Sequence, residues 1–150
     1  MIRIICVGKI KEKYFIDAVN EYKKRLSKYT KLEIIELNDE SLDIKTTIKK
    51  ESDNILKNIH LDDYNIALTI EGEELDSVSL SKKINNILIN NSNITFIIGG
   101  SYGISDEIKG LCNYQLSFSK LTFPHQLFRV ILLEQIYRSF KILNNESYHK

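Results

Sequence analysis

The sequence predicts an α/β protein: a mainly parallel sheet of five to six strands with helices on both faces. Short apolar runs rich in β-branched residues alternate along the chain with segments whose apolar residues recur at helical spacing. The connections are long enough for crossover helices, and such alternation is typical of a parallel sheet covered on both sides. There is no internal repeat, linker or low-complexity segment, so residues 1–150 are expected to form one domain.

The first half of the chain contains three expected strands and two expected helices. A helix is predicted from Glu12 to Leu26, where apolar residues recur at helical spacing between lysines and arginines. A second helix, Ile44–Ile59, matches a single apolar face less well. The strands are predicted at Ile2–Val7, Leu32–Leu37 and Tyr64–Ile70, the last followed by an exit turn at Glu71–Glu74.

The second half opens with a helix over Val78–Leu88, which we expect Ser77 or Ser79 to cap. A strand at Ile94–Ile98 then leads into Gly99–Gly103, a loop with three glycines in five residues. Glycine allows backbone angles that side chains forbid. This pattern indicates a strand that delivers its C-terminal end into a binding loop.

The chain ends with a short helix, a strand and a long helix. Ser105 is expected to cap the short helix, whose first turn carries two acidic residues. The last strand, Tyr114–Ser119, leads through Pro124 into a helix over His125–Leu143. Two consecutive strand ends therefore open onto two loops, which is where open α/β sheets bind ligands.

The helix His125–Leu143 is apolar on more than one stripe, which one sheet face cannot bury. We therefore expect a second copy of the chain to cover it in a homodimer. Glu134 and Arg138 lie four residues apart in the favourable order, so a simple surface ion pair is an alternative to a functional role.

Charge is segregated along the chain although the net charge is only +1. Residues 1–31 hold nine Lys/Arg against three acids, residues 32–76 hold four against thirteen, and residues 120–150 hold five against two. If the two basic ends meet, they form a patch for RNA phosphate that includes Lys23, Lys24 and Arg25. The alternative is that each run is a solvated helix face.

Several classes of protein are excluded or disfavoured. No apolar run approaches the ~20 residues of a membrane span, and lysine follows the first apolar run too early for a signal peptide, so the cytoplasm is the expected location. Cys6 and Cys112 are expected to be buried free thiols, and no metal site is expected. A hydrolase built on Ser101 or Ser119 with His125 lacks a nucleophile elbow.

The chain resembles the RlmH family of SPOUT-class (α/β-knot) methyltransferases, which modify pseudouridine in large-subunit (23S) ribosomal RNA. The resemblance covers the whole chain, and Leu116–Arg129 is its most specific part. It is carried by R-I-I-C-V-G-K (Arg3–Lys9), I-I-G-G-S-Y-G-I-S (Ile97–Ser105), L-S-F-S-K-L-T-F-P-H-Q-L-F-R-V (Leu116–Val130), E-Q-I-Y-R-S-F (Glu134–Phe140) and the terminal Y-H-K.

The resemblance implies a deep trefoil knot near the C-terminus and S-adenosylmethionine bound in it. Apolar side chains there can sandwich an adenine, although core packing is an alternative for Leu121 and Phe123. A side chain at Gly99 or Gly100 is expected to occupy the space of the adenosine. The family's cofactor pattern falls on Leu68, Gly99, Gly100, Phe118, Ser119, Lys120, Leu121, Thr122 and Phe123.

The resemblance also names the reaction, methylation of N3 of a pseudouridine on the ribosome, and places Arg138, Tyr148 and His149 on the substrate side. His149 is the candidate base because its unperturbed pKa lies near neutrality. Tyr148 can stack on a flipped-out base, and Arg138 can pair with phosphate or with developing negative charge. The alternative is that residues at a chain end are frayed and inert.

Two further readings belong to other classes. One is a dimeric RNA- or ribosome-binding factor without catalysis, which the basic ends would serve equally well. The other is a flavodoxin-like nucleotide binder. Binding of S-adenosylmethionine would favour the enzyme over the non-catalytic factor. Flavin colour in the purified protein would reveal a flavodoxin-like binder.

Overall fold

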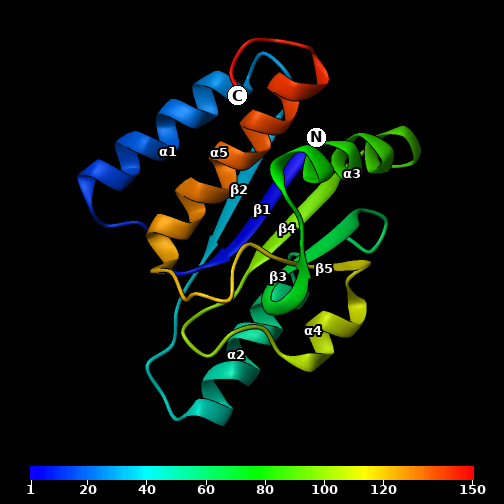
Figure 1. Ribbon diagram of the computed structural model, residues 1–150. Coiled ribbons are helices and arrows are strands. Elements are labelled where there is room, and N and C mark those ends of the chain that lie inside the picture. Colours follow the sequence, from blue (N-terminus) through cyan, green and yellow to red (C-terminus); the bar gives the residue numbers. More distant parts are fainter.

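The computed structural model describes all 150 residues, and its strands and helices alternate without exception (Figure 1). The elements are β1 (Ile2–Val7), α1 (Lys13–Leu26), β2 (Leu32–Leu37), α2 (Ile44–Leu56), β3 (Tyr64–Glu74), α3 (Ser77–Asn90), β4 (Ile94–Ile98), α4 (Asp106–Leu111), β5 (Tyr114–Ser117) and α5 (His125–Leu143). One five-stranded sheet has the order β2-β1-β4-β3-β5, and every pairing is parallel. The predicted fold class is confirmed in its sheet and its layers.

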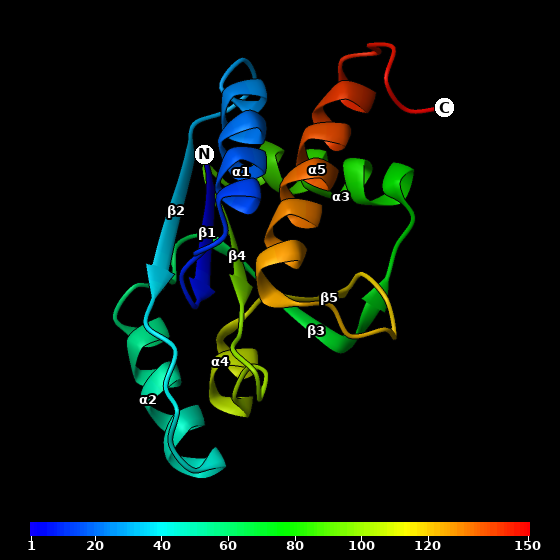
Figure 2. The ribbon, with the colours of Figure 1, turned by 90° about the vertical axis from the view of Figure 1, so that its left-hand side faces the viewer.

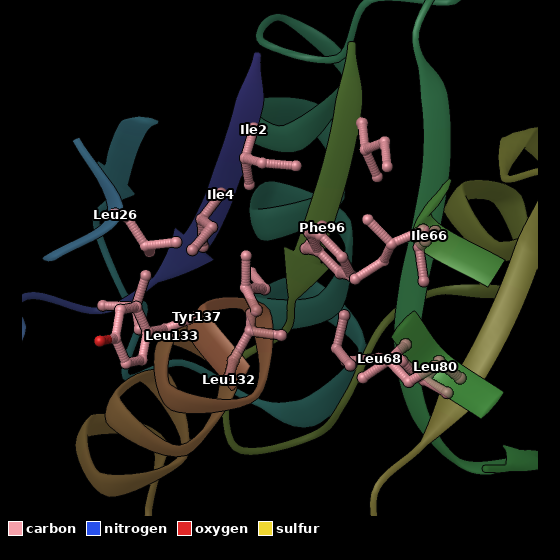
Figure 3. Packing of buried hydrophobic residues seen from close by; sticks show 14 of the residues in the cluster. Ile2, Ile4, Leu26, Ile66, Leu68, Leu80, Phe96, Leu132, Leu133 and Tyr137 are labelled. Carbon is pink, nitrogen blue, oxygen red and sulfur yellow. The ribbon is translucent and has the colours of Figure 1, made fainter. Parts of the chain in front are cut away.

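Three helices, α1, α3 and α5, cover one face of the sheet, and Figure 2 shows them grouped apart from α2 and α4. The larger core lies beneath them, and Figure 3 shows how its side chains interdigitate. α5 runs between α1 and α3, so much of its apolar surface is covered within the chain. The argument that this helix needs a second copy is therefore weaker than the sequence suggested, and the homodimer stays a prediction. The fully buried side chains of α5 include Leu132, Leu133 and Ile136.

The opposite face carries a smaller core under α2 and α4, in which Ile55 and Ile108 meet Ile5, Ala67 and Ile97 of the strands. The buried face of α2 is mostly polar, because Thr47, Glu51 and Ser52 are buried there beside Ile55. This explains why the apolar pattern of that segment matches a single face poorly.

Two local predictions were wrong. Glu71–Glu74 is not an exit turn, because β3 continues to Glu74 through a register shift between Leu68 and Glu73 and stays paired with β5. The close approach requires Gly72, since a Cβ there would lie 2.8 Å from the backbone of Gln115 and Leu116. The cap of α3 is neither serine: Asp76 accepts from Ser79 N at 2.7 Å.

The edge of the sheet where the strands begin is held by a buried polar cluster. Arg3 donates to Glu33 at 2.8 Å and also pairs with the buried Asp63. Asp63 accepts further bonds from Asn93 at 3.0 Å and Thr95 at 2.8 Å. Buried charges need such partners, so this edge is structural and the opposite edge is left for ligands. None of the helices combines the length and the apolar character needed to cross a membrane.

Candidate active site

A cavity of about 430 Å³ lies where β4 and β5 end. Its walls come from residues 68–71 of β3, 98–104 after β4 and 116–128 between β5 and α5, with Lys109 of α4. Sites for cofactors and other small ligands have roughly 300–1,000 Å³, mostly apolar walls and a few polar groups. The cavity fits that description, and three segments far apart in the sequence must fold together to make it.

Eight of the nine residues assigned to the cofactor line this cavity, and Lys120 does not. The Lys120 side chain is 79% exposed, and its Nζ lies 4.0 Å from a carboxylate oxygen of Glu74. Leu121 is 71% exposed, so core packing does not account for it. The eight are Leu68, Gly99, Gly100, Phe118, Ser119, Leu121, Thr122 and Phe123.

Three phenylalanines form one wall of the cavity. The ring centroid of Phe128 lies 5.1 Å from that of Phe118 and 6.0 Å from that of Phe123, with the second pair stacked. Flat apolar walls of this kind suit the faces of an adenine ring. The residues present therefore fit the adenosine part of S-adenosylmethionine.

The glycine loop is tight for a different reason from the one the sequence suggested. A Cβ on Gly99 would lie 2.8 Å from the carbonyl of Gly103, and a Cβ on Gly100 would lie 2.6 Å from the carboxylate of Glu51. The Cβ position of each glycine therefore meets protein atoms. That a larger side chain there would also fill the space of the adenosine stays a prediction.

An ion pair at the cavity joins two residues that the sequence reasoning missed. Lys109 of α4 donates to Glu71 of β3, and both line the cavity. This hydrogen bond is the main reason that the pKa of Glu71 lies below its usual range. Glu71 was missed because its segment was assigned to a turn.

The start of α5 is fixed by a buried arginine. Arg129 is 2% exposed and donates to Glu36 at 2.5 Å and to the carbonyl of Gly8 at 2.9 Å. One turn earlier, His125 lines the cavity, and burial followed by the charge of Arg129 lowers its pKa. No hydrogen bond joins His125 to Ser101 or Ser119, so the arrangement of a serine hydrolase is absent.

The C-terminal tail, red in Figure 1, turns back along α5. Glu134 accepts from Arg138 Nη2 at 2.6 Å and from the Tyr148 hydroxyl at 3.1 Å. The Arg138 Cζ atom lies 4.7 Å from the centre of the Tyr148 ring, and its Nη1 is 3.2 Å from His149 Nδ1. Burial and then Glu134 raise the pKa of Tyr148 to about 12, so it stays protonated. The three candidate catalytic residues are therefore brought together, with Arg138 and Tyr148 on the Glu134 carboxylate and His149 on Arg138.

A second hollow, of about 600 Å³, adjoins the cavity. His149 lines it together with residues of α3 and α5. Leu116, Phe118 and Phe123 line both spaces, so they form a shared wall between them. The tail and the cofactor cavity are thus neighbours.

The basic ends of the chain do meet, because α1 packs against α5. The cations of α5 are mostly neutralised: Arg129, Arg138 and Lys141 each pair with a glutamate. On α1, Arg25 pairs with Glu21 at 2.9 Å and lies over the Tyr22 ring. Exposed cations without an ion pair include Lys23, Lys24 and Lys28.

A parallel sheet of this order, with a cofactor cavity built from the loops after β4 and β5, defines a SPOUT-class methyltransferase. The family described as "Predicted SPOUT methyltransferase" matches residues 1–149. The structure of a tRNA (m1G37) methyltransferase from Aquifex aeolicus matches 91% of this chain and 69% of its own, with 14% identity and a TM-score of 0.56. That likeness supports the fold alone.

Sequence relatives identify the family of SPOUT methyltransferases to which the chain belongs. A relative from Methanococcus vannielii is 57% identical over 99% of both chains. The ribosomal RNA large subunit methyltransferase H of Clostridium tetani is 54% identical, again over 99% of both. The chain belongs to this methyltransferase H (RlmH) family.

Membership of the family confirms the trefoil-knotted SPOUT fold and an enzyme that uses S-adenosylmethionine. The alternatives of a non-catalytic factor and of a flavodoxin-like binder are thereby excluded.

Proposed function

We propose that this chain transfers a methyl group from S-adenosylmethionine to N3 of a pseudouridine in large-subunit (23S) ribosomal RNA. The substrate class is suggested by its relatives, which are named as ribosomal RNA large subunit methyltransferases. The observation that carries the proposal is the wall shared by Phe118 and Phe123, which separates the cofactor cavity from a hollow lined by His149. Methyl transfer requires the donor and the acceptor to be held in contact, and two adjoining spaces would place them side by side.

The cofactor is assigned to the cavity of about 430 Å³ beside the glycine loop. Leu68, Leu121 and the phenylalanine wall would hold the adenine, and the backbone of residues 99–103 would approach the ribose closely. When bound, S-adenosylmethionine supplies a methyl group already activated by its positive sulfur. The protein therefore needs mainly to orient the acceptor, and orientation alone can supply several kcal/mol.

The acceptor nitrogen is a weak nucleophile until it loses its proton. His149 is the candidate base, because its ring nitrogen contacts Arg138 and it faces the second hollow. Arg138 would stabilise the negative charge that develops on the pseudouridine ring as its N3 proton leaves. The Tyr148 ring packs against Arg138 and Tyr137, so we assign Tyr148 to holding Arg138 and His149 in place. A flipped-out nucleobase could stack on Tyr148 only by displacing Arg138 or Tyr137.

RNA phosphate is assigned to unpaired lysines at the C-terminal end of α1. Lys23 and Lys24 lie on α1, which packs against α5, the helix that carries Arg138, and Lys28 lies in the turn just after α1. All three lysines are exposed. Arg25, by contrast, is occupied by Glu21 and Tyr22. We place the reaction on the assembled ribosome in the cytoplasm.

A homodimer is part of the proposal. Three large apolar side chains around the cavity are still exposed: Leu121 at 71%, Ile70 at 47% and Tyr102 at 47%. Exposed apolar groups clustered at one site favour a partner surface. A partner copy would cover them and complete the substrate side of each site. Light scattering should give the mass of two chains at micromolar concentration, whereas an active monomer would contradict this.

Methyl transfer to defined ribosomal substrates tests the function. Labelled S-adenosylmethionine is incubated with the enzyme and with ribosomes, isolated subunits or naked RNA from a strain that lacks this modification. We expect label in large-subunit RNA of the assembled ribosome, and mass spectrometry should place it on N3 of a pseudouridine. Label on another atom or on small-subunit RNA only would overturn the proposal.

A further inference from the structure

A buried carboxylate lies against the glycine loop without lining the cavity. Glu51 of α2 is 3% exposed. One of its oxygens accepts from the backbone N–H of Glu40 at 3.4 Å, and Oε2 has no hydrogen-bond partner. Its carboxylate lies within 2.7 Å of the position that a Cβ of Gly100 would take. A buried carboxylate with so little support is costly, so its place in the fold calls for a reason.

The next residue of α2 contacts the other end of the same segment. The hydroxyl of Ser52 lies 2.8 Å from that of Ser105. Ser105 also accepts from Ile108 N at 3.3 Å and so caps α4. Two adjacent side chains of α2 thus contact residues 100 and 105, the two ends of the loop that lines the cavity.

We propose that Glu51 and Ser52 are positioning residues that hold the loop of residues 99–105 in the shape that receives S-adenosylmethionine. On this account Gly100 is a glycine because the Glu51 carboxyl occupies the place of its side chain. The inference rests on the proposed function, since it takes the cavity to be the cofactor site. A loop ordered in advance binds its ligand more tightly, because the ligand does not have to order it.

Single substitutions on α2 give the first test. Glu51→Ala and Ser52→Ala should each weaken S-adenosylmethionine binding in calorimetry by about tenfold, as expected when a loop loses its preorganisation. Turnover at saturating cofactor should stay near that of the parent, so that only KM for the cofactor rises. Glu51→Gln keeps the shape and should retain affinity. Asp53→Ala, on the exposed side of the same helix, is the matched control.

A double-variant cycle separates this account from direct contact with the cofactor. Gly100→Ala alone should weaken binding, because the new Cβ collides with Glu51. In the Glu51→Ala background the same change should have little further effect, so the two losses are not additive. Equal losses in both backgrounds would mean that the cofactor itself needs the space, and would overturn the proposal.

The same binding measurements show whether the positioning role of Glu51 and Ser52 is wrong or whether the cavity is not the cofactor site. If Phe123→Ala leaves cofactor affinity unchanged, the cavity is not the site and the proposed function fails there. If Phe123→Ala weakens binding but Glu51→Ala and Ser52→Ala do not, only the positioning role fails. Circular dichroism and thermal unfolding show that each variant is folded. Should Glu51→Ala not fold, Ser52→Ala decides the question, and unchanged cofactor affinity in that variant would overturn the positioning role.

Discussion

The hydroxyl of Tyr148 donates a 3.1 Å hydrogen bond to Glu134, the same carboxylate oxygen that accepts from Arg138. Fourteen positions separate the two residues, so the bond ties the end of the chain to the middle of α5. The ring of Tyr148 also packs edge-on against Tyr137, with centroids 5.0 Å apart. The tail is therefore part of the folded structure and is not frayed, and its role in the reaction stays a prediction.

Deletion of Tyr148–Lys150 should separate binding from catalysis. We expect cofactor affinity to be nearly unchanged, because none of the three residues lines the cavity of about 430 Å³ that is assigned to the cofactor. Methyl transfer should fall by at least about a hundredfold, the usual contribution of a general base. His149→Ala should reproduce most of the loss, and His60→Ala, at an exposed position elsewhere, should not. Normal single-turnover rates in the truncated enzyme would remove the tail from the mechanism.

Gly99→Ala should weaken cofactor binding by distorting the loop. Its Cβ would lie 2.8 Å from the Gly103 carbonyl and from the side chain of Ile104, so the loop must shift. Gly110→Ala is the control, because nothing lies within 4 Å of a Cβ there. Isothermal calorimetry measures both. Equal affinities for the two variants would show that the loop does not touch the cofactor.

Reversing the charge of Lys23 and Lys24 should weaken ribosome binding. The log–log slope of affinity against salt should fall by up to about two units, because each lost phosphate contact contributes somewhat less than one. Lys49→Glu/Lys50→Glu, at exposed positions of α2, changes the net charge equally on another helix and is the control. Identical losses from both pairs would mean a nonspecific charge effect. Cofactor affinity should not change in either variant.

Glu51→Gln should change how stability depends on pH. Burial, with Asp39 and Glu40 nearby, raises the pKa of Glu51 above its ordinary value. The folded state therefore binds more protons than the unfolded chain, and stability falls as pH rises from about 4.3 through the raised pKa. Glutamine does not titrate, so the variant should gain stability relative to the parent as pH rises from about 4.3 through the raised pKa, and the difference should level off above it. A constant difference in denaturant unfolding would contradict the shifted pKa.

The sequence pattern was sufficient for most of the fold and for the position of the loop. The β-branched runs at Ile2–Val7 and Ile94–Ile98 gave strands with the predicted bounds, because buried parallel strands are continuously apolar. The extension of β3 was missed because Glu71–Glu74 reads as a polar turn. It exists through tertiary pairing with β5, which local pattern does not encode.

The parts of the site that were missed are those made by contacts between distant segments. Glu51 reads as a solvent-facing acid in a helix, although its spacing from Ile55 places it on the buried face. The Glu71–Lys109 pair joins residues 38 positions apart and has no local signal. The knot is a property of the path of the whole chain, so only resemblance to a known family predicted it.

A crystal structure with S-adenosylhomocysteine, the product of the cofactor, tests the central claim most directly. The account predicts the adenine between Leu68, Leu121 and the phenylalanine wall, with the loop of residues 99–103 unchanged over Glu51. The sulfur should face the hollow lined by His149. Density for the ligand elsewhere, for example in the groove lined by Lys82, Lys83 and Asn90, would contradict the account.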